Sequence, residues 1–269
     1  MILTLKQQRI IQELGRYKYL TVSQFLRLGV DKHRSNLSTA FKRLTEGKRP
    51  LVKVLKFGLI PTKGRVEALY YLTSRGAVLV EGAKYPRSRT VTLTSDYFHR
   101  VVTIDCEIAL YSSSSIKEVS FSHRYFDHTG SNRTGNRKIT TSLPLSGNSK
   151  DIIADWVFMI NTGVQDELYC AEIYMDDHDT TRPFNSLQSY LQALHEGAPN
   201  EVFDFDRGTR VLAIFNNEGV MERVIQKLQN DPLFEEFVDY FLFRSVEKTQ
   251  AFNFHKGWID YVGEIKKIW

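Results

Sequence analysis

Cysteine is scarce in this sequence, and long apolar runs are absent. Only Cys106 and Cys170 occur among the 269 residues, too few for a zinc site built on cysteines and unlike a disulfide scaffold. No stretch of 18 uncharged apolar residues is present, so we expect no membrane-spanning helix. The first residues are charged early and have helical periodicity, unlike an export signal. We therefore expect a cytoplasmic protein with no membrane partner.

Acidic residues are scarce in the first hundred residues, which hold 20 Lys and Arg but only 6 Asp and Glu. The remaining residues reverse the balance, with 16 Lys and Arg against 25 Asp and Glu. This asymmetry predicts two domains with different roles, and the basic domain would attract a polyanion. An inert basic surface is the alternative. We place the domains at residues 1–82 and 96–269, joined by a linker at 83–95.

The first domain contains three helical segments followed by two alternating runs. Helical periodicity covers residues 5–14, 22–29 and 31–47, and the runs at 51–58 and 65–72 predict a hairpin. This order is that of a winged helix-turn-helix, in which the third helix enters the major groove of DNA. We therefore expect the first domain to bind double-stranded DNA.

The side chains expected at the DNA surface are polar or basic, the types that contact base edges and phosphates. They come from the third helical segment and from the hairpin: Lys32, His33, Arg34, Asn36, Ser38, Thr39, Lys42, Arg43, Lys53, Lys56, Lys63 and Arg65. Two alternatives remain open. The face could simply be solvated, or the winged helix could contact proteins alone.

The second domain alternates between helical and extended patterns. We expect helices at 95–113, from 180 or 181 onward, at 219–229 and at 258–269, and strands at 116–126, 151–160, 167–175, 210–215 and 239–247. Residues 128–150 have the composition of a loop that is disordered or becomes ordered on nucleic acid. The pattern predicts an α+β protein with a winged helix before an α/β core.

One acidic stretch stands out in this domain. DELYCAEIYMDDHD, residues 166–179, holds six carboxylates and no Lys or Arg. If the strands at 151–160 and 167–175 form a tight antiparallel hairpin, Ile160 lies opposite Glu167 and Asp155 lies opposite Glu172. Opposed residues have Cβ atoms about 5 Å apart, so the two carboxylates would repel each other unless a hard cation binds between them. A solvated strand end, or pairing with a nearby basic residue, is the alternative.

This order of elements resembles the PD-(D/E)xK restriction-endonuclease-like nuclease core. The resemblance is carried by HRVVTIDCEIAL, by IADWVFMI, and by AEIYMDDHDTTRPFNSLQSYLQAL followed by RVLAIF. A winged helix in front of such a core is similar to the replication-relaxation family and to MobC-type (MOB-C) plasmid mobilisation relaxases. The likeness extends loosely over nearly the whole chain and is closest across residues 150–215.

The resemblance implies a nuclease site that uses Mg²⁺ or Mn²⁺. Asp155 and Glu172 match the two acids of the motif, and Glu107 matches an acid that some such enzymes add to the metal site. The Lys of the motif is absent, because Tyr174 stands two residues after Glu172. Its catalytic role would then fall to Tyr174 itself or to one of two other residues, Arg182 and Gln188, or the site would be inactive. A Glu107 at a solvated helix edge and a Tyr174 that only packs are the simpler interpretations.

Three functional hypotheses follow. The first is a plasmid or mobile-element protein, active in mobilisation and conjugation, that binds an origin and nicks one strand as a relaxase-like endonuclease. Its partners would be double-stranded DNA and relaxosome accessory or coupling proteins. The second is a non-catalytic DNA-binding regulator with a decayed nuclease core. The third is a transcription regulator whose second domain senses a ligand. Because no Walker-type phosphate loop occurs, NTP use is not expected.

Overall fold

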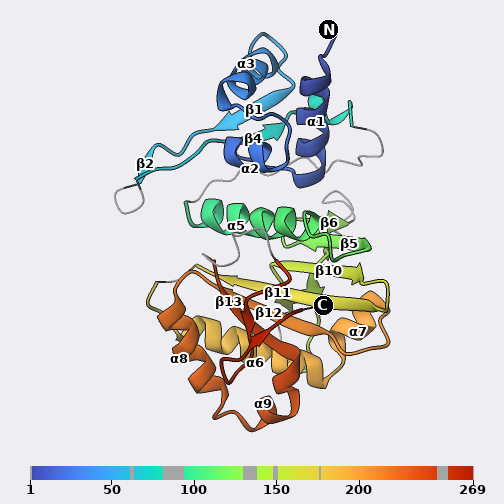
Figure 1. Ribbon diagram of the computed structural model, residues 1–269, viewed down its shortest axis with the longest axis vertical. Coiled ribbons are helices and arrows are strands. Elements are labelled where there is room, and N and C mark those ends of the chain that lie inside the picture. Colours follow the sequence, from blue (N-terminus) through green and yellow to red (C-terminus); the bar gives the residue numbers. More distant parts are fainter. Residues whose placement is uncertain are drawn as a thin grey trace. The chain divides into compact units, whose positions relative to one another are not determined.

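The protein is mixed α+β, and its chain divides into two compact units, residues 1–108 and 109–269 (Figure 1). The computed structural model describes residues 2–60, 64–80, 94–129, 138–147, 151–175, 177–246 and 254–268. Most of the predicted linker at 83–95 lies outside these residues. Within the described ranges, no helix has both the length and the apolar character needed to cross a membrane.

Three helices and an antiparallel hairpin build the first unit, in the order that the sequence predicts. The helices are α1 (Leu5–Tyr17), α2 (Val22–Arg27) and α3 (Arg34–Thr45), and the hairpin pairs β1 (Val52–Leu55) with β4 (Leu69–Leu72). Between the two hairpin strands lie β2 (Leu59–Ile60) and β3 (Gly64–Arg65), and α4 (Ser74–Ala77) follows the hairpin.

Local sequence explains where the first two helices begin. Thr4 and Thr21 each accept a hydrogen bond from the backbone of a Gln three residues later, and that Gln side chain bonds back to the cap. This capping box satisfies two backbone groups that a helix start otherwise leaves unpaired. In α3, the buried residues Leu37, Phe41 and Leu44 form one stripe, which leaves the polar residues on the opposite face.

The boundary between the units falls inside helix α5 (Thr94–Tyr111) instead of before it. A buried carboxylate explains this position. Asp105 accepts a 2.7 Å hydrogen bond from Gln24 and pairs with the guanidinium of Arg27, both on α2. Burial raises the pKa of Asp105, and the Arg27 charge opposes that rise. The first part of α5 therefore belongs to the first unit, although its sequence continues directly into the second.

A seven-stranded mixed sheet forms the second unit, with the spatial order β15-β14-β13-β12-β11-β10-β5. Its strands are β5 (Glu118–Arg124), β10 (Trp156–Asn161), β11 (Asp166–Tyr174), β12 (Arg210–Phe215), β13 (Phe241–Ser245), β14 (Trp258–Ile259) and β15 (Ile265–Lys266). Strands β11, β12 and β13 are parallel, and the other pairs are antiparallel.

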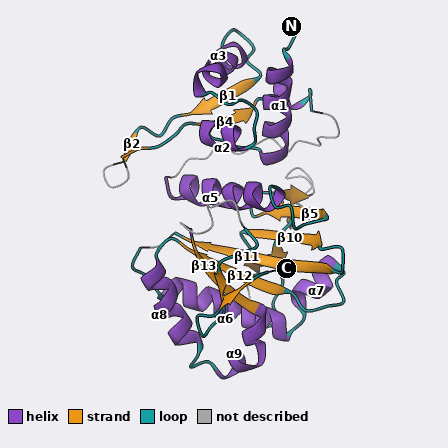
Figure 2. Ribbon diagram, viewed as in Figure 1, coloured by secondary structure: helices purple, strands orange, loops and turns teal. Residues whose placement is uncertain are grey.

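Helices cover one face of this sheet (Figure 2). They are α6 (Thr181–His195), α7 (Ala198–Phe203), α8 (Glu218–Leu228) and α9 (Pro232–Phe237), which a 3₁₀ turn at Val238–Tyr240 follows. The C-terminal segment lies on the opposite face, where the Phe254 ring packs on Trp156 and Trp258. Tyr169 donates a 2.6 Å hydrogen bond to the Ile268 carbonyl on that face.

The structure corrects two predictions for the second unit. The last segment is not a helix, because β14 and β15 form a hairpin around Gly263, whose φ is +87°. Asp260 fixes this turn by accepting hydrogen bonds from the backbone of Val262 and Glu264. The predicted loop at 128–150 contains three short strands in its described part: β6 (His128–Thr129), β7 (Lys138–Ile139) and β8 (Ser142–Leu143), which pairs with β9 (Ile152–Ile153) just after the loop. Helices α7 and α9 were not predicted.

Candidate functional site

The hairpin of β10 and β11 has the register that the sequence predicts. Ile160 pairs with Glu167, and Trp156 pairs with Ala171. The turn is tighter than expected, since Asn161 and Asp166 also pair. Asp155 does not lie within the strand but directly before β10. The register nevertheless places it beside Glu172, on the face of the sheet that the helices cover.

Asp155 and Glu172 form a buried carboxylate pair. Their exposed fractions are only 6% and 8%. The backbone N–H of Ile173 donates a 2.7 Å hydrogen bond to Asp155 Oδ2, and the Tyr190 hydroxyl donates a 2.8 Å bond to Glu172 Oε1. Each acid is thus held by a donor from the protein, which fixes the direction of both carboxyl groups.

The environment of the carboxylate pair favours a proton on Glu172. Burial raises the pKa of Glu172 well above its usual range, and the charge of Asp155 and a side-chain hydrogen bond with it raise this pKa further. The Tyr190 hydroxyl and the positive charge of Arg182 act in the opposite direction. Two acids that cannot both ionise cheaply are a frequent feature of functional sites.

Helix α6 presents a polar stripe to the carboxylate pair. Arg182, Ser186 and Tyr190 are spaced by four residues, so they follow one face of the helix. Tyr190 bonds to Glu172. Burial raises the pKa values of Glu172 and Tyr174; Ser186 offsets part of the rise for Tyr174, and the charge of Arg182 offsets part of it for both. The stripe brings hydroxyl groups and one positive charge to an otherwise apolar helix face.

Tyr174 stands where the resembled motif has its lysine. Its ring packs on Phe215 at 4.8 Å between centroids, and burial together with the Glu172 charge raises the pKa of its hydroxyl. Although Ser186 is close enough to lower that pKa, the buried hydroxyl makes no well-formed hydrogen bond with any described residue. A buried polar atom without a partner is costly, so this hydroxyl is available to a group bound at the carboxylate pair.

Gln188 lies away from the carboxylate pair, and Glu107 belongs to the other compact unit. Gln188 donates a 2.8 Å hydrogen bond to Asp231 at the start of α9, on another side of α6. Glu107 is buried on α5 within the first unit. Across the described ranges, no three His, Cys, Asp or Glu side chains gather as a metal-binding group.

The other described acids of residues 166–179 have local roles. Asp166 accepts a hydrogen bond from Asn161, Asp177 accepts one from Asn216, and Asp179 accepts one from the Thr181 backbone at the start of α6. Glu167 contacts the hydroxyl of Tyr169 and pairs with Arg210 at 3.6 Å. Glu172 differs from these four acids because its carboxylate is buried next to another acid.

The predicted DNA-contacting residues of α3 and β1 are exposed. Exposure applies to Lys32, His33, Arg34, Asn36, Ser38, Thr39, Lys42, Arg43, Lys53 and Lys56. Arg34 pairs with Glu67, and Asn36 donates a 3.1 Å hydrogen bond to Asp31. Within the described residues, Lys42, Arg43 and Lys53 form no ion pair, so their charges remain directed at solvent. Lys63 lies outside the described residues, and no side-chain placement is described for Arg65.

Tyr190 and Ser186 are the site residues that sequence reasoning missed. Both lie on α6, the helix that follows β11 in the chain. A hydroxyl on the inner face of the helix that follows an acidic strand is the signal that would have identified Tyr190. The Ile173 backbone donor carries no such signal in the sequence.

Comparison of the chain with protein-family models, with curated proteins and with solved structures finds no match.

Proposed function

We propose that this chain is a DNA-processing protein that binds a double-stranded site with its first unit and cleaves one strand with its second. The order of helices and hairpin in the first unit fits a winged helix-turn-helix, whose third helix would be α3. The resemblance to relaxase families makes a plasmid or mobile-element origin the proposed target. The buried pair of Asp155 and Glu172 is the observation that carries the proposal.

The chemistry of the carboxylate pair fits a hard divalent cation. Mg²⁺ in proteins often uses one or two carboxylates and completes its shell with water and substrate phosphate. The cation would polarise the scissile phosphate and stabilise the charge that develops on it. Asp155 and Glu172 would supply the ligands, held in direction by the Ile173 N–H and the Tyr190 hydroxyl. Arg182, at the edge of the pair, would stabilise the negative phosphate.

Tyr174 has a separate role in this proposal. Its hydroxyl is buried, burial and then the Glu172 charge raise its pKa, and it has no well-formed hydrogen bond with the described residues. It would orient the attacking water by donating or accepting a hydrogen bond. It cannot supply the positive charge of a lysine, so we expect slower cleavage than a lysine-containing site would give.

The alternative function is a DNA-binding regulator that carries no chemistry. Tyr174 in place of the motif lysine favours it, and so does the fact that each acid already has a hydrogen-bond donor from the protein. In that case the protonated pair would only hold β10, β11 and α6 together.

A nicking assay separates the two functions. The duplex sequence that the protein binds is first selected from a random library. A supercoiled plasmid that carries this sequence is then incubated with the protein and Mn²⁺. We expect wild-type protein to give open circles and Asp155→Asn to give none above background. Glu222→Gln, which removes an exposed acid from α8, is the matched control and should nick normally. Equal nicking by Asp155→Asn would show that the roles are misassigned, and absence of nicking by any protein would favour the regulator.

A further inference from the structure

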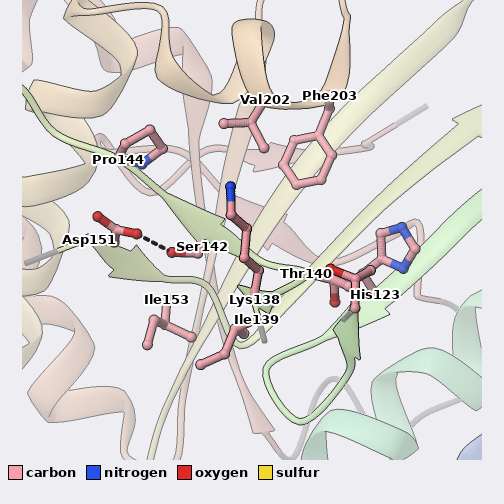
Figure 3. A pocket seen from close by; sticks show the side chains of 11 residues that line it. His123, Lys138, Ile139, Thr140, Ser142, Pro144, Asp151, Ile153, Val202 and Phe203 are labelled. Atoms are coloured by element: carbon pink, nitrogen blue, oxygen red, sulfur yellow. Dashed lines mark hydrogen bonds between the residues drawn. The ribbon is translucent and has the colours of Figure 1, made fainter. Parts of the chain in front are cut away.

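A second polar feature lies on the face of the sheet that the helices cover, at its β5 edge. It is a cleft of about 970 Å³ whose walls come from β5, from the short strands β6 to β9, and from α7 (Figure 3). This volume lies in the range of small-molecule sites. None of its lining residues belongs to the carboxylate pair or to the polar stripe of α6.

One wall of the cleft is aromatic and is held in place from behind. His123 and Phe203 line it. Both rings stack on Phe121, with centroid distances of 5.0 Å and 5.5 Å and interplanar angles of 18° and 23°. Because Phe121 fixes the rings, they form a prepared surface on which a flat group can stack.

The centre and the opposite wall are polar. Lys138 extends its amino group into the open space of the cleft, toward α7 (Figure 3). Lys138 is exposed and forms no ion pair within the described residues. Across the cleft, Asp151 accepts a 2.5 Å hydrogen bond from the Ser142 hydroxyl. The apolar residues Ile153 and Val202 also line the cleft. Their exposed fractions are 44% and 39%, so apolar surface is open to a ligand beside these polar groups.

We infer that this cleft binds one nucleotide unit of a single nucleic-acid strand. A base would stack on the aromatic wall, its phosphate would pair with Lys138, and the sugar or an amino group of the base would donate to Asp151. Stacking surfaces combined with a cation are the usual means of holding single strands without sequence preference. The inference rests on the proposed function only in taking nucleic acid as the source, because a free mononucleotide offers the same chemistry.

The test measures binding of a short fluorescein-labelled deoxyadenosine strand by fluorescence anisotropy, with EDTA present. Phe203→Leu keeps an apolar side chain but removes the stacking ring, and we expect about tenfold weaker binding. Lys138→Gln should weaken binding and reduce the slope of log affinity against log salt by about 0.7, the value for one phosphate contact on a single strand. Lys117→Gln removes an equally exposed lysine just before β5 and should leave binding unchanged. Circular dichroism spectra check that each variant is folded.

Competition with unlabelled adenosine monophosphate distinguishes the two sources. If adenosine monophosphate displaces the strand, the cleft also accepts free nucleotides. If it does not, a strand is required. Either result supports nucleotide binding in the cleft, provided that Phe203→Leu and Lys138→Gln weaken binding. Normal binding by Phe203→Leu and Lys138→Gln, an equal loss in Lys117→Gln, or no binding by wild-type protein would overturn the inference.

The metal-free assay also separates this inference from the proposed cleavage function. Asp155→Asn should bind the strand normally while failing to nick. If it nicks like wild type and Phe203→Leu still binds weakly, the proposed catalytic roles fail and the cleft stands.

Discussion

At the scale of single residues, the protein buries two neighbouring carboxyl groups, those of Asp155 and Glu172, away from water. Burial and the charge of Asp155 raise the pKa of Glu172, and the Tyr190 hydroxyl and the Arg182 charge oppose that rise. Buried like charges destabilise a fold unless something compensates them. The carboxylate pair therefore links stability to pH, and in the proposed function it also links both to cation binding.

The first prediction concerns stability in EDTA. The folded-state pKa of Glu172 lies above its unfolded value, so stability is greatest below the unfolded pKa and falls as pH rises toward the folded pKa. Glu172→Gln removes the ionisable group, so the variant should exceed wild type by on the order of 1–3 kcal/mol near pH 8 and by much less near pH 4.5. The free energy of unfolding is measured by urea titration. Tryptophan fluorescence monitors the transition, because the buried Trp156 and Trp258 report on the second unit.

Glu222→Gln is the control for that experiment, because Glu222 is exposed on α8. The difference in the free energy of unfolding between Glu222→Gln and wild type should not grow with pH. A Glu172→Gln variant whose advantage is the same at both pH values would contradict the raised pKa.

The second prediction concerns the donor to Glu172. Tyr190→Phe removes the 2.8 Å hydrogen bond that lowers the pKa of Glu172. The proton then competes more strongly with a cation, so Mn²⁺ affinity near pH 6.5 should fall about tenfold, with partial recovery near pH 8.5. Calorimetric titration measures both values. Tyr240→Phe, which removes a hydroxyl elsewhere in the unit, should bind Mn²⁺ normally; unchanged affinity in Tyr190→Phe would show that this bond plays no part.

At the scale of elements, sequence patterns predicted most of the helices and strands that carry the carboxylate pair and the exposed face of α3. The register of β10 and β11 follows from a short turn between two apolar runs, so Glu167 was placed correctly opposite Ile160. The last segment was misassigned because WIDYVGEIKKIW fits a helix and a hairpin equally, and the turn depends on Asp260 and a positive φ at Gly263. The polar stripe of α6 could not be recognised, since it depends on which helix face meets Glu172.

The third prediction belongs to helix α3. Lys42 and Arg43 are exposed in its last turn, so replacing both with Gln should leave up to two DNA phosphates without a neutralising charge. Duplex affinity should fall, and the slope of log affinity against log salt should decrease by about 0.9 for each such phosphate. Filter binding over a salt series measures this. The double variant Lys117→Gln, Lys256→Gln changes the net charge equally in the second unit, and an equal loss of affinity in it would point to general charge instead of α3.

At the scale of the whole molecule, charge and chemistry are divided between the two units. The first hundred residues carry the basic excess and the exposed polar face of α3, whereas the acidic remainder carries the carboxylate pair and the cleft. The account therefore requires duplex binding and cation binding to be separable. The α3 variant should keep its Mn²⁺ affinity, and Asp155→Asn should keep its duplex affinity.

The most direct test of the central claim is a calorimetric titration of Mn²⁺ into the wild-type protein and into Glu172→Gln. We predict about one bound ion per wild-type chain and loss of that binding in the variant. Equal binding by the two proteins, or no binding by either with DNA absent and then present, would contradict a cation site at Asp155 and Glu172.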